Sequence, residues 1–166
     1  MLCRTRTDVG AELITLADAK EVTRMAEYSA NAVQTVNPGE AIVFTENPVP
    51  CMQGLVRHRD GTGAFLLSGR SNCPCKRTVN YLVDFGANIA VPTGETVGPI
   101  SVAIAVDGTT IPGTEMEVTP AAVEEFFNVS RAANVGIWNG CCESVSIRNT
   151  SAIPILVENA NVIFSR

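Results

Sequence analysis

The stretch TVNYLVDFGANI, residues 78–89, decides the fold of this chain, because it suits either a catalytic loop or a buried strand. It contains Asp84-Phe85-Gly86, the triplet that holds magnesium in protein kinases. A kinase also needs a glycine-rich ATP loop, a strand lysine and a catalytic Asp-to-Asn motif, and the sequence has none of them. Every odd position is apolar and the even positions are mostly polar, which is the period of a half-buried strand. The apolar positions are Val79, Tyr81, Val83, Phe85, Ala87 and Ile89.

The same two-residue period recurs along the chain from about residue 33 onward. Apolar residues alternate in 100–106, 127–137, 145–147 and 153–164, and turn residues (Gly, Pro, Asn and Asp) separate these runs. In the last run the apolar positions shift by one residue, as a β-bulge would cause. We therefore predict an all-β domain over residues 33–166, a jelly-roll sandwich of eight to ten antiparallel strands.

Residues 1–32 differ from the rest. The segment ITLADAKEVTRMAEYSANAV, residues 14–33, has no Gly or Pro, and Thr15 and Asp18 suit the start of a helix. Its apolar stripe is weak, so we predict an N-terminal arm that is a short helix or a docking segment. The start, MLCRTRTDVGAE, lacks the apolar stretch of a secretory signal, and we expect the chain to mature in the cytosol. The candidate docking residues of the arm are Leu13, Leu16, Val22 and Met25.

The composition indicates a packed domain with little surface charge. Apolar residues make up 46% of the chain and charged residues 17%, which suggests that a partner chain hides part of the surface. The net charge of −5 argues against nucleic-acid binding, and no apolar run is long enough to span a membrane. Two charged clusters are either solvated loops or complementary patches across a subunit contact. The basic cluster is Arg57, Arg59, Arg70, Lys76 and Arg77, and the acidic cluster is Glu115, Glu117, Glu124 and Glu125.

Several segments together resemble a known superfamily. They are NPGEAIVF (37–44), VNYLVDFGANIAVPTG (79–94), GPISVAIAVDGTTIPG (98–113), FFNVSRAANV (126–135), GCCESVSIRNTS (140–151) and PILVENANVIF (154–164). The chain is similar to the jelly roll of the tumour necrosis factor and complement globular-head superfamily, in particular to the short versions encoded by Gram-positive bacteria and their phages. The resemblance implies a compact homotrimer without enzymatic activity. It makes five aromatic residues candidates for the trimer axis or for the core of a single protomer: Tyr81, Phe85, Phe127, Trp138 and Phe164.

The sequence offers no catalytic constellation, and we expect neither an enzyme nor a bound cofactor. Its one histidine, His58, lies between Arg57 and Arg59, whose charges disfavour a catalytic base, so we expect an exposed strand or hairpin residue. No phosphate-binding glycine motif leads into a helix.

The cysteines leave three alternatives open. Cys3 and Cys51 stand alone, and neither Cys73-Pro74-Cys75 nor Cys141-Cys142 has the spacing of a common zinc site. The jelly-roll topology that the resemblance implies would bring Cys73, Cys75, Cys141 and Cys142 to one end of the sandwich. They are then free thiols, disulfides, or a metal site of four thiolates.

Two classes of function fit these features. The first is a structural, trimeric phage virion component, such as a capsid decoration or head fibre, which is assembled in the host cytoplasm and displayed through the N-terminal arm. Its partners would be its own copies and, through the N-terminal arm, a capsid protein or another protein of the particle. The second is a receptor- or glycan-binding head on a phage tip or a bacterial spore surface. An enzyme ranks third.

Overall fold

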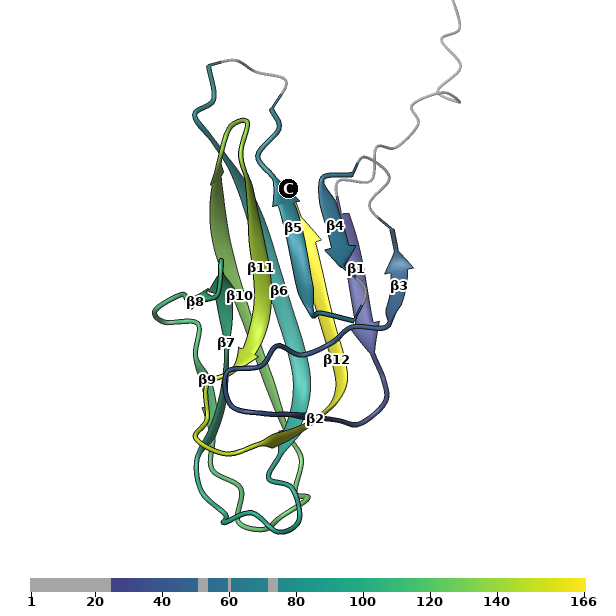
Figure 1. The fold of residues 1–166 in the computed structure, drawn as a ribbon, viewed down its shortest axis with the longest axis vertical. Coiled ribbons are helices and arrows are strands. Elements are labelled where there is room, and N and C mark those ends of the chain that lie inside the picture. Colours follow the sequence, from purple (N-terminus) through teal and green to yellow (C-terminus); the bar gives the residue numbers. More distant parts are fainter. Residues whose placement is uncertain (1–24, 51–53, 60, 72–74) are drawn as a thin grey trace, which may run out of the picture.

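The computed structural model describes residues 25–50, 54–59, 61–71 and 75–166, which form a two-layered antiparallel sandwich without a helix (Figure 1). One sheet has the strand order β10-β6-β12-β1-β3, with β2 beside β12, and the other has the order β4-β5-β11-β7-β8, with β9 beside β7. The all-β prediction is confirmed, and the strand number exceeds the predicted range because several strands are short. The strands are β1 (Met25–Ala30), β2 (Gln34–Val36), β3 (Glu46–Val49), β4 (Val56–Arg59), β5 (Ala64–Ser68), β6 (Thr78–Ala90), β7 (Ile100–Val106), β8 (Thr109–Thr110), β9 (Met116–Val118), β10 (Phe127–Trp138), β11 (Cys142–Asn149) and β12 (Ile155–Ser165).

The core fills the space between the two sheets. The odd residues of β6 from Val79 to Ile89 are all buried, so the stretch 78–89 is the half-buried strand that its period predicts. Phe65 is the centre of an aromatic cluster, with ring centroids 4.8 Å from both Tyr28 and Phe164. His58 stacks on Phe65 at 4.8 Å and is half-buried, so our expectation of an exposed histidine is wrong. The imidazole contributes to packing between the layers.

The predicted β-bulge lies in β12. The pairing of β12 with β6 shifts between Glu158 and Asn161, and Asn159 has a φ of 49°. Asn tolerates this left-handed conformation better than most residues. The extra residue lets Val157 and Ala160 both face the core.

Strand β1 corrects the prediction for the end of the N-terminal arm. Residues 25–30 are not helical; they lie between β12 and β3 in the first sheet, with Ala26 and Tyr28 buried. Alanine gives a weak strand signal, so this strand depends on pairing with its neighbours more than on its own sequence. Residues 1–24 lie outside the described residues, including the predicted docking residues Leu13, Leu16 and Val22.

The turn after β11 is tied to β2 and β7 by buried polar side chains. Asn149 is 1% exposed, and its Nδ2 donates to the carbonyl oxygens of Val36 (2.9 Å) and Ile153 (3.0 Å). The Ser151 hydroxyl accepts a hydrogen bond from the Ser101 amide at 2.7 Å. These bonds satisfy backbone groups at the point where the sheets close.

The two ends of the long axis of the sandwich differ in what they carry. Met25 pairs with Ser165, so β1 begins beside the end of β12, and the C-terminus lies at this end (Figure 1). The loops 91–99 and 119–126 lie at the opposite end (Figure 1). In the part of the chain that the structure describes, no helix could cross a membrane.

Candidate functional site

The outer face of the first sheet is a surface that the core does not use. We call the outward-facing residues of β1, β6, β10 and β12 the amide face, because asparagine is its characteristic side chain. Its charged side chains among the described residues are Glu27, Asp84 and Glu158, all acidic. Such a face has little charge for a surface in contact with water.

Hydrogen bonds between side chains cross the amide face from strand to strand. The Asn128 amide donates to the Asn88 side-chain oxygen (3.1 Å), and Asn88 donates to Glu158 (3.4 Å). The Asn161 amide donates to Glu27 at 2.6 Å. These pairs connect β10 to β6, β6 to β12 and β12 to β1, so they hold the polar side chains in fixed positions.

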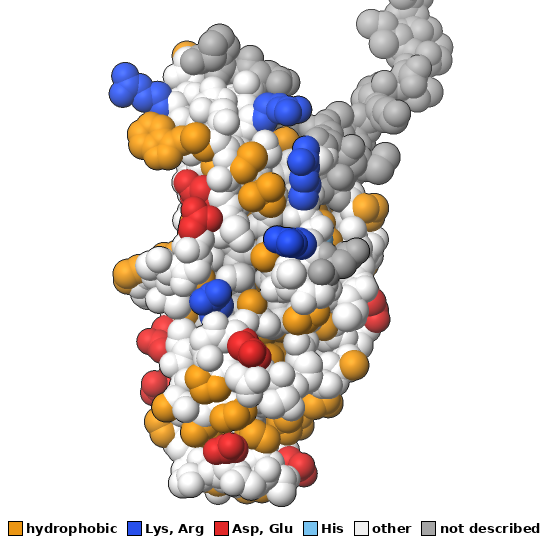
Figure 2. Space-filling model, in the orientation of Figure 1, with side chains coloured by type: hydrophobic (Ala, Val, Ile, Leu, Met, Phe, Trp, Pro, Cys, Tyr) orange, Lys and Arg blue, Asp and Glu red, His pale blue; other side chains and the backbone are white. Residues whose placement is uncertain are grey.

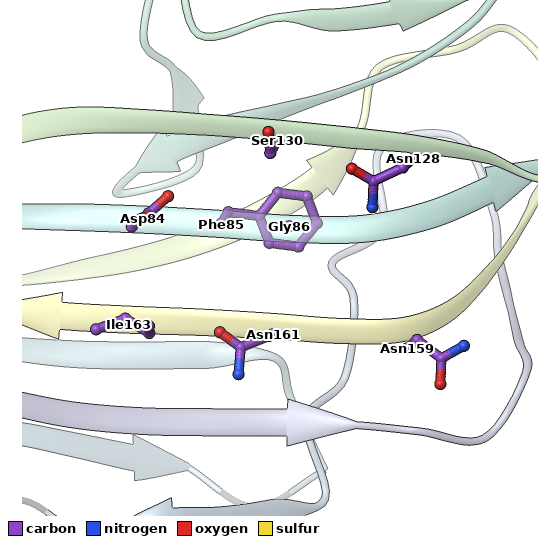
Figure 3. A pocket seen from close by; sticks show the side chains of 8 residues that line it. All are labelled: Asp84, Phe85, Gly86, Asn128, Ser130, Asn159, Asn161 and Ile163. Carbon is purple, nitrogen blue, oxygen red and sulfur yellow. The ribbon is translucent and has the colours of Figure 1, made fainter.

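A hollow of about 330 Å³ lies in this face (Figure 3). It forms where Gly86, which has no side chain, pairs with Ser130, which has a short one. Its side chains come from three strands, β6, β10 and β12, as Figure 3 shows. The residues that line it are Asp84, Phe85, Gly86, Asn128, Ser130, Asn159, Asn161 and Ile163.

The hollow is lined by hydrogen-bonding side chains of three kinds. Asp84 is its one carboxylate, and the other polar groups are amides and a hydroxyl, which donate and accept hydrogen bonds but do not activate a nucleophile. No group of three or more His, Cys, Asp or Glu in the described part of the chain could hold a metal ion. The hollow suits a polar or cationic side chain that needs hydrogen-bond acceptors.

Exposed apolar side chains accompany the hollow. Leu82 on β6 is 41% exposed and Trp138 at the end of β10 is 59% exposed, and both alternate with core residues of their strands. Strand β10 is also the edge of the sheet, with no further strand beside it among the described residues. A twelve-residue edge with apolar neighbours is a surface that proteins cover or protect.

The five aromatic residues that the resemblance singled out fall into two groups. Tyr81, Phe85 and Phe164 are each 1% exposed and lie in the core of the sandwich. The Tyr81 hydroxyl donates to the Ser68 carbonyl at 2.6 Å. Phe127 and Trp138, at the two ends of β10, are on the surface.

The cysteines do not share one state. Thr78 pairs with Trp138, so the segment that begins with Cys75 and the turn that leads to Cys141 lie at the same end of the sheet. Cys75 is disulfide-bonded, whereas Cys141 and Cys142 are exposed free thiols. A disulfide sulfur is not a thiolate, so Cys75 is not available here to the four-thiolate metal site considered above. Cys3, Cys51 and Cys73 lie outside the described residues.

Charge is unevenly distributed along the sandwich. On the face that Figure 2 shows, Lys and Arg gather mostly toward the end with the C-terminus, and Asp and Glu mostly toward the other end. The basic cluster lies in β4 and in the segment before β6, and the acidic cluster lies in and near β9 and in the loop 119–126.

Comparison with known proteins identifies the fold. No family model matches the sequence, and no curated protein matches it. The Eiger TNF of S. frugiperda has a similar structure, with a TM-score of 0.61 and 13% identity over 86% of this chain and 90% of that chain. The globular domain of zebrafish complement 1qA protein follows at 0.55 and 13%, over 85% and 93%. Murine APRIL has a TM-score of 0.54 and 7% identity, over 86% and 98%. The chain is thus a jelly roll of the type seen in tumour necrosis factor and complement heads, as the sequence motifs predicted.

Proposed function

We propose that this chain is a non-enzymatic structural protein that forms a homotrimer and is displayed on the surface of a phage particle, as a capsid decoration or head fibre. The observation that carries the proposal is the amide face, a hydrogen-bonded and weakly charged surface beside exposed apolar residues and an open sheet edge. The exposed apolar residues and the open edge of this surface are costly in water and are stabilised when a second protein surface covers them. The fold and the resemblance favour other copies of the same chain as that cover.

The placement of the chain ends supports display. The 24 residues before Met25 join the domain beside the end of β12, and the loops 91–99 and 119–126 lie at the far end (Figure 1). An attachment segment at one end leaves the loops at the other end pointing outward. In this proposal residues 1–24 bind the particle, and the domain that begins at residue 25 forms the trimeric head.

One observation favours the alternative, a receptor- or glycan-binding head. Val97, Val123 and Phe127 are exposed in or beside the far loops, close in sequence to Glu95, Glu124 and Glu125. An aromatic side chain beside carboxylates suits the recognition of sugars or of basic peptides. The amide face would still be covered by self-association in this case.

A matched pair of substitutions tests self-association through the amide face. Leu82 on the first sheet and Leu66 on the second are both exposed, at 41% and 39%, and both alternate with core residues. Native mass spectrometry should find that Leu82→Glu dissociates the trimer, because a carboxylate would be buried beside Asp84, whereas Leu66→Glu leaves it intact. Equal behaviour of the two variants would contradict the proposed interface.

Display is tested separately from assembly. Removal of residues 1–24 should leave the trimer intact but prevent it from binding to particles that lack the protein. Full-length protein is the control, and labelling with an antibody against the head detects binding by electron microscopy. If the shortened protein still binds the particle, the proposed role of the N-terminal segment is wrong.

A further inference from the structure

Two charged side chains on neighbouring strands have no partner within the described chain. Arg131 is the only Lys or Arg in the strands of the first sheet, and it is exposed. Their backbones belong to the strand ladders, but the side chain of neither Arg131 nor Asp84 forms a hydrogen bond or an ion pair with another described residue. Guanidinium and carboxylate groups form strong paired hydrogen bonds when a partner is available.

The geometry of the sheet prevents these two residues from satisfying each other. Arg131 pairs with Phe85, and Ala132 pairs with Asp84, so Arg131 and Asp84 are diagonal neighbours. Asp84 is on the amide face, whereas Arg131 shares its side of β10 with the buried Val129. Arg131 is nevertheless exposed, because β10 is the edge strand and its core-facing side opens at the rim of the sandwich.

Symmetry restricts which residues can meet in a trimer. We take the threefold axis of the proposed trimer to be parallel to the long axis of the sandwich, because the attachment segment and the far loops are at opposite ends of that axis (Figure 1). A rotation about such an axis changes no position along it. A residue of one protomer therefore contacts residues at its own level on the next protomer. Arg131 pairs with Phe85 and so lies at the level of Phe85, which is one of the residues that line the hollow (Figure 3).

The same restriction excludes the contact suggested by the two charged clusters of the sequence. The basic cluster belongs to β4 and the segment before β6, toward the end with the C-terminus, and the acidic cluster to β9 and the loop 119–126, toward the other end (Figure 1). Protomers that stand side by side in the same direction would not bring these clusters together. Among the described strands of the first sheet, Arg131 is then the cation that can reach an acidic group at its own level.

We propose that Arg131 of one protomer enters the hollow of the next and pairs there with Asp84. The inference rests on the trimer proposed above and names a contact that fixes the position of each protomer relative to the next. The lining of the hollow also supplies hydrogen-bond acceptors, namely the hydroxyl of Ser130 and the side-chain oxygen of Asn161, both at the level of Gly86, two residues along β6 from Asp84 (Figure 3). The pair repeats around the ring, so each edge strand β10 is covered and each hollow is filled.

A charge-swap cycle tests this contact. The variants are Arg131→Glu, Asp84→Arg and the double variant, with Arg57→Glu on the second sheet as the matched control, since Arg57 is also an exposed strand arginine. Sedimentation velocity gives the dissociation constant of each trimer, and circular dichroism checks that each protomer folds. We expect each single change to weaken the trimer at least about tenfold and the double variant to recover most of the loss. Arg57→Glu should leave the constant unchanged.

The outcomes separate this inference from the proposed function. If the wild-type chain is a trimer and Arg131→Glu assembles as tightly, Arg131 only protects the sheet edge and the contact is wrong, while the proposed trimer stands. A double variant no tighter than the single ones would also overturn the pairing. A monomeric wild-type chain would overturn the proposed function itself.

Discussion

Arg131 on β10 pairs with Phe85 on β6, which is the residue next to Asp84, yet the side chains of Arg131 and Asp84 point to opposite faces of the sheet. A single protomer therefore presents an acidic hollow on one surface and an arginine at the adjoining edge. This arrangement is complementary between copies and not within one copy, which is the property that a heterologous ring contact needs.

Gly69 is placed where no larger residue fits. Its amide donates to the Cys141 carbonyl at 2.8 Å, and a Cβ at this position would overlap the carbonyl oxygen of Trp138. We expect Gly69→Ala to destabilise the fold by about 1–3 kcal/mol, because backbone must move to relieve the overlap. Urea unfolding at a fixed protomer concentration measures this loss in the free energy of unfolding. The control is Gly98→Ala, where a Cβ would meet nothing within 4 Å, and a similar loss there would contradict the explanation.

Asn149 should be the most sensitive polar residue of the turn after β11. Its side chain donates to Val36 and Ile153 and accepts from the Ser151 amide at 2.8 Å. Asn149→Ala would leave these buried backbone groups unpaired, so we expect a loss of about 1–3 kcal/mol in the free energy of unfolding.

Asn31→Ala provides the comparison for this prediction. Asn31 donates to the Glu46 carboxylate at 3.0 Å, but the pair is exposed to water. Its loss should change the free energy of unfolding by less than about 0.5 kcal/mol. Equal changes in the free energy of unfolding for Asn31→Ala and Asn149→Ala would show that burial does not determine how much these hydrogen bonds contribute to stability.

The boundary of the head can be tested by truncation. Because β1 lies between β12 and β3, a chain that begins at residue 25 should fold, and one that begins at residue 33 should lose a strand and the buried Tyr28. We expect the longer form to melt cooperatively and the shorter form to lose cooperative melting or to aggregate. Thermal unfolding of the two shortened chains, followed by circular dichroism, tests this expectation. Identical melting curves would contradict the role of β1 in the fold.

Thiol labelling tests the assigned states of the cysteines. The exposed thiols of Cys141 and Cys142 should react with a maleimide in the native protein, whereas Cys75 should react only after reduction. Peptide mass spectrometry identifies the labelled positions. Labelling of Cys75 without a reductant would show that its disulfide is absent.

Much of the fold is predictable from the sequence, because the two-residue period is strong wherever large apolar residues alternate. The period identified β6, and the shift between Val157 and Ala160 identified the bulge of β12. The period was too weak at residues 25–30, where alanine occupies two of the buried positions and neighbouring strands decide the conformation.

The amide face was harder to predict for a different reason. Its asparagines come from strands far apart in the sequence, and only the pairing register brings Asn128 and Asn161 to the same hollow. The one available signal was the polar side of residues 78–89, which carries a single charge, Asp84. Arg131 was unpredictable because its position in the alternation suggests the core, and only its place on the edge strand exposes it.

The most direct measurement is the mass of the chain in solution. Sedimentation equilibrium at low micromolar concentration, with the full sequence and with residues 25–166, should give three times the mass of one chain in both cases. A mass equal to that of a single chain would contradict the account at its centre, because the amide face and the edge strand β10 would then be exposed to water.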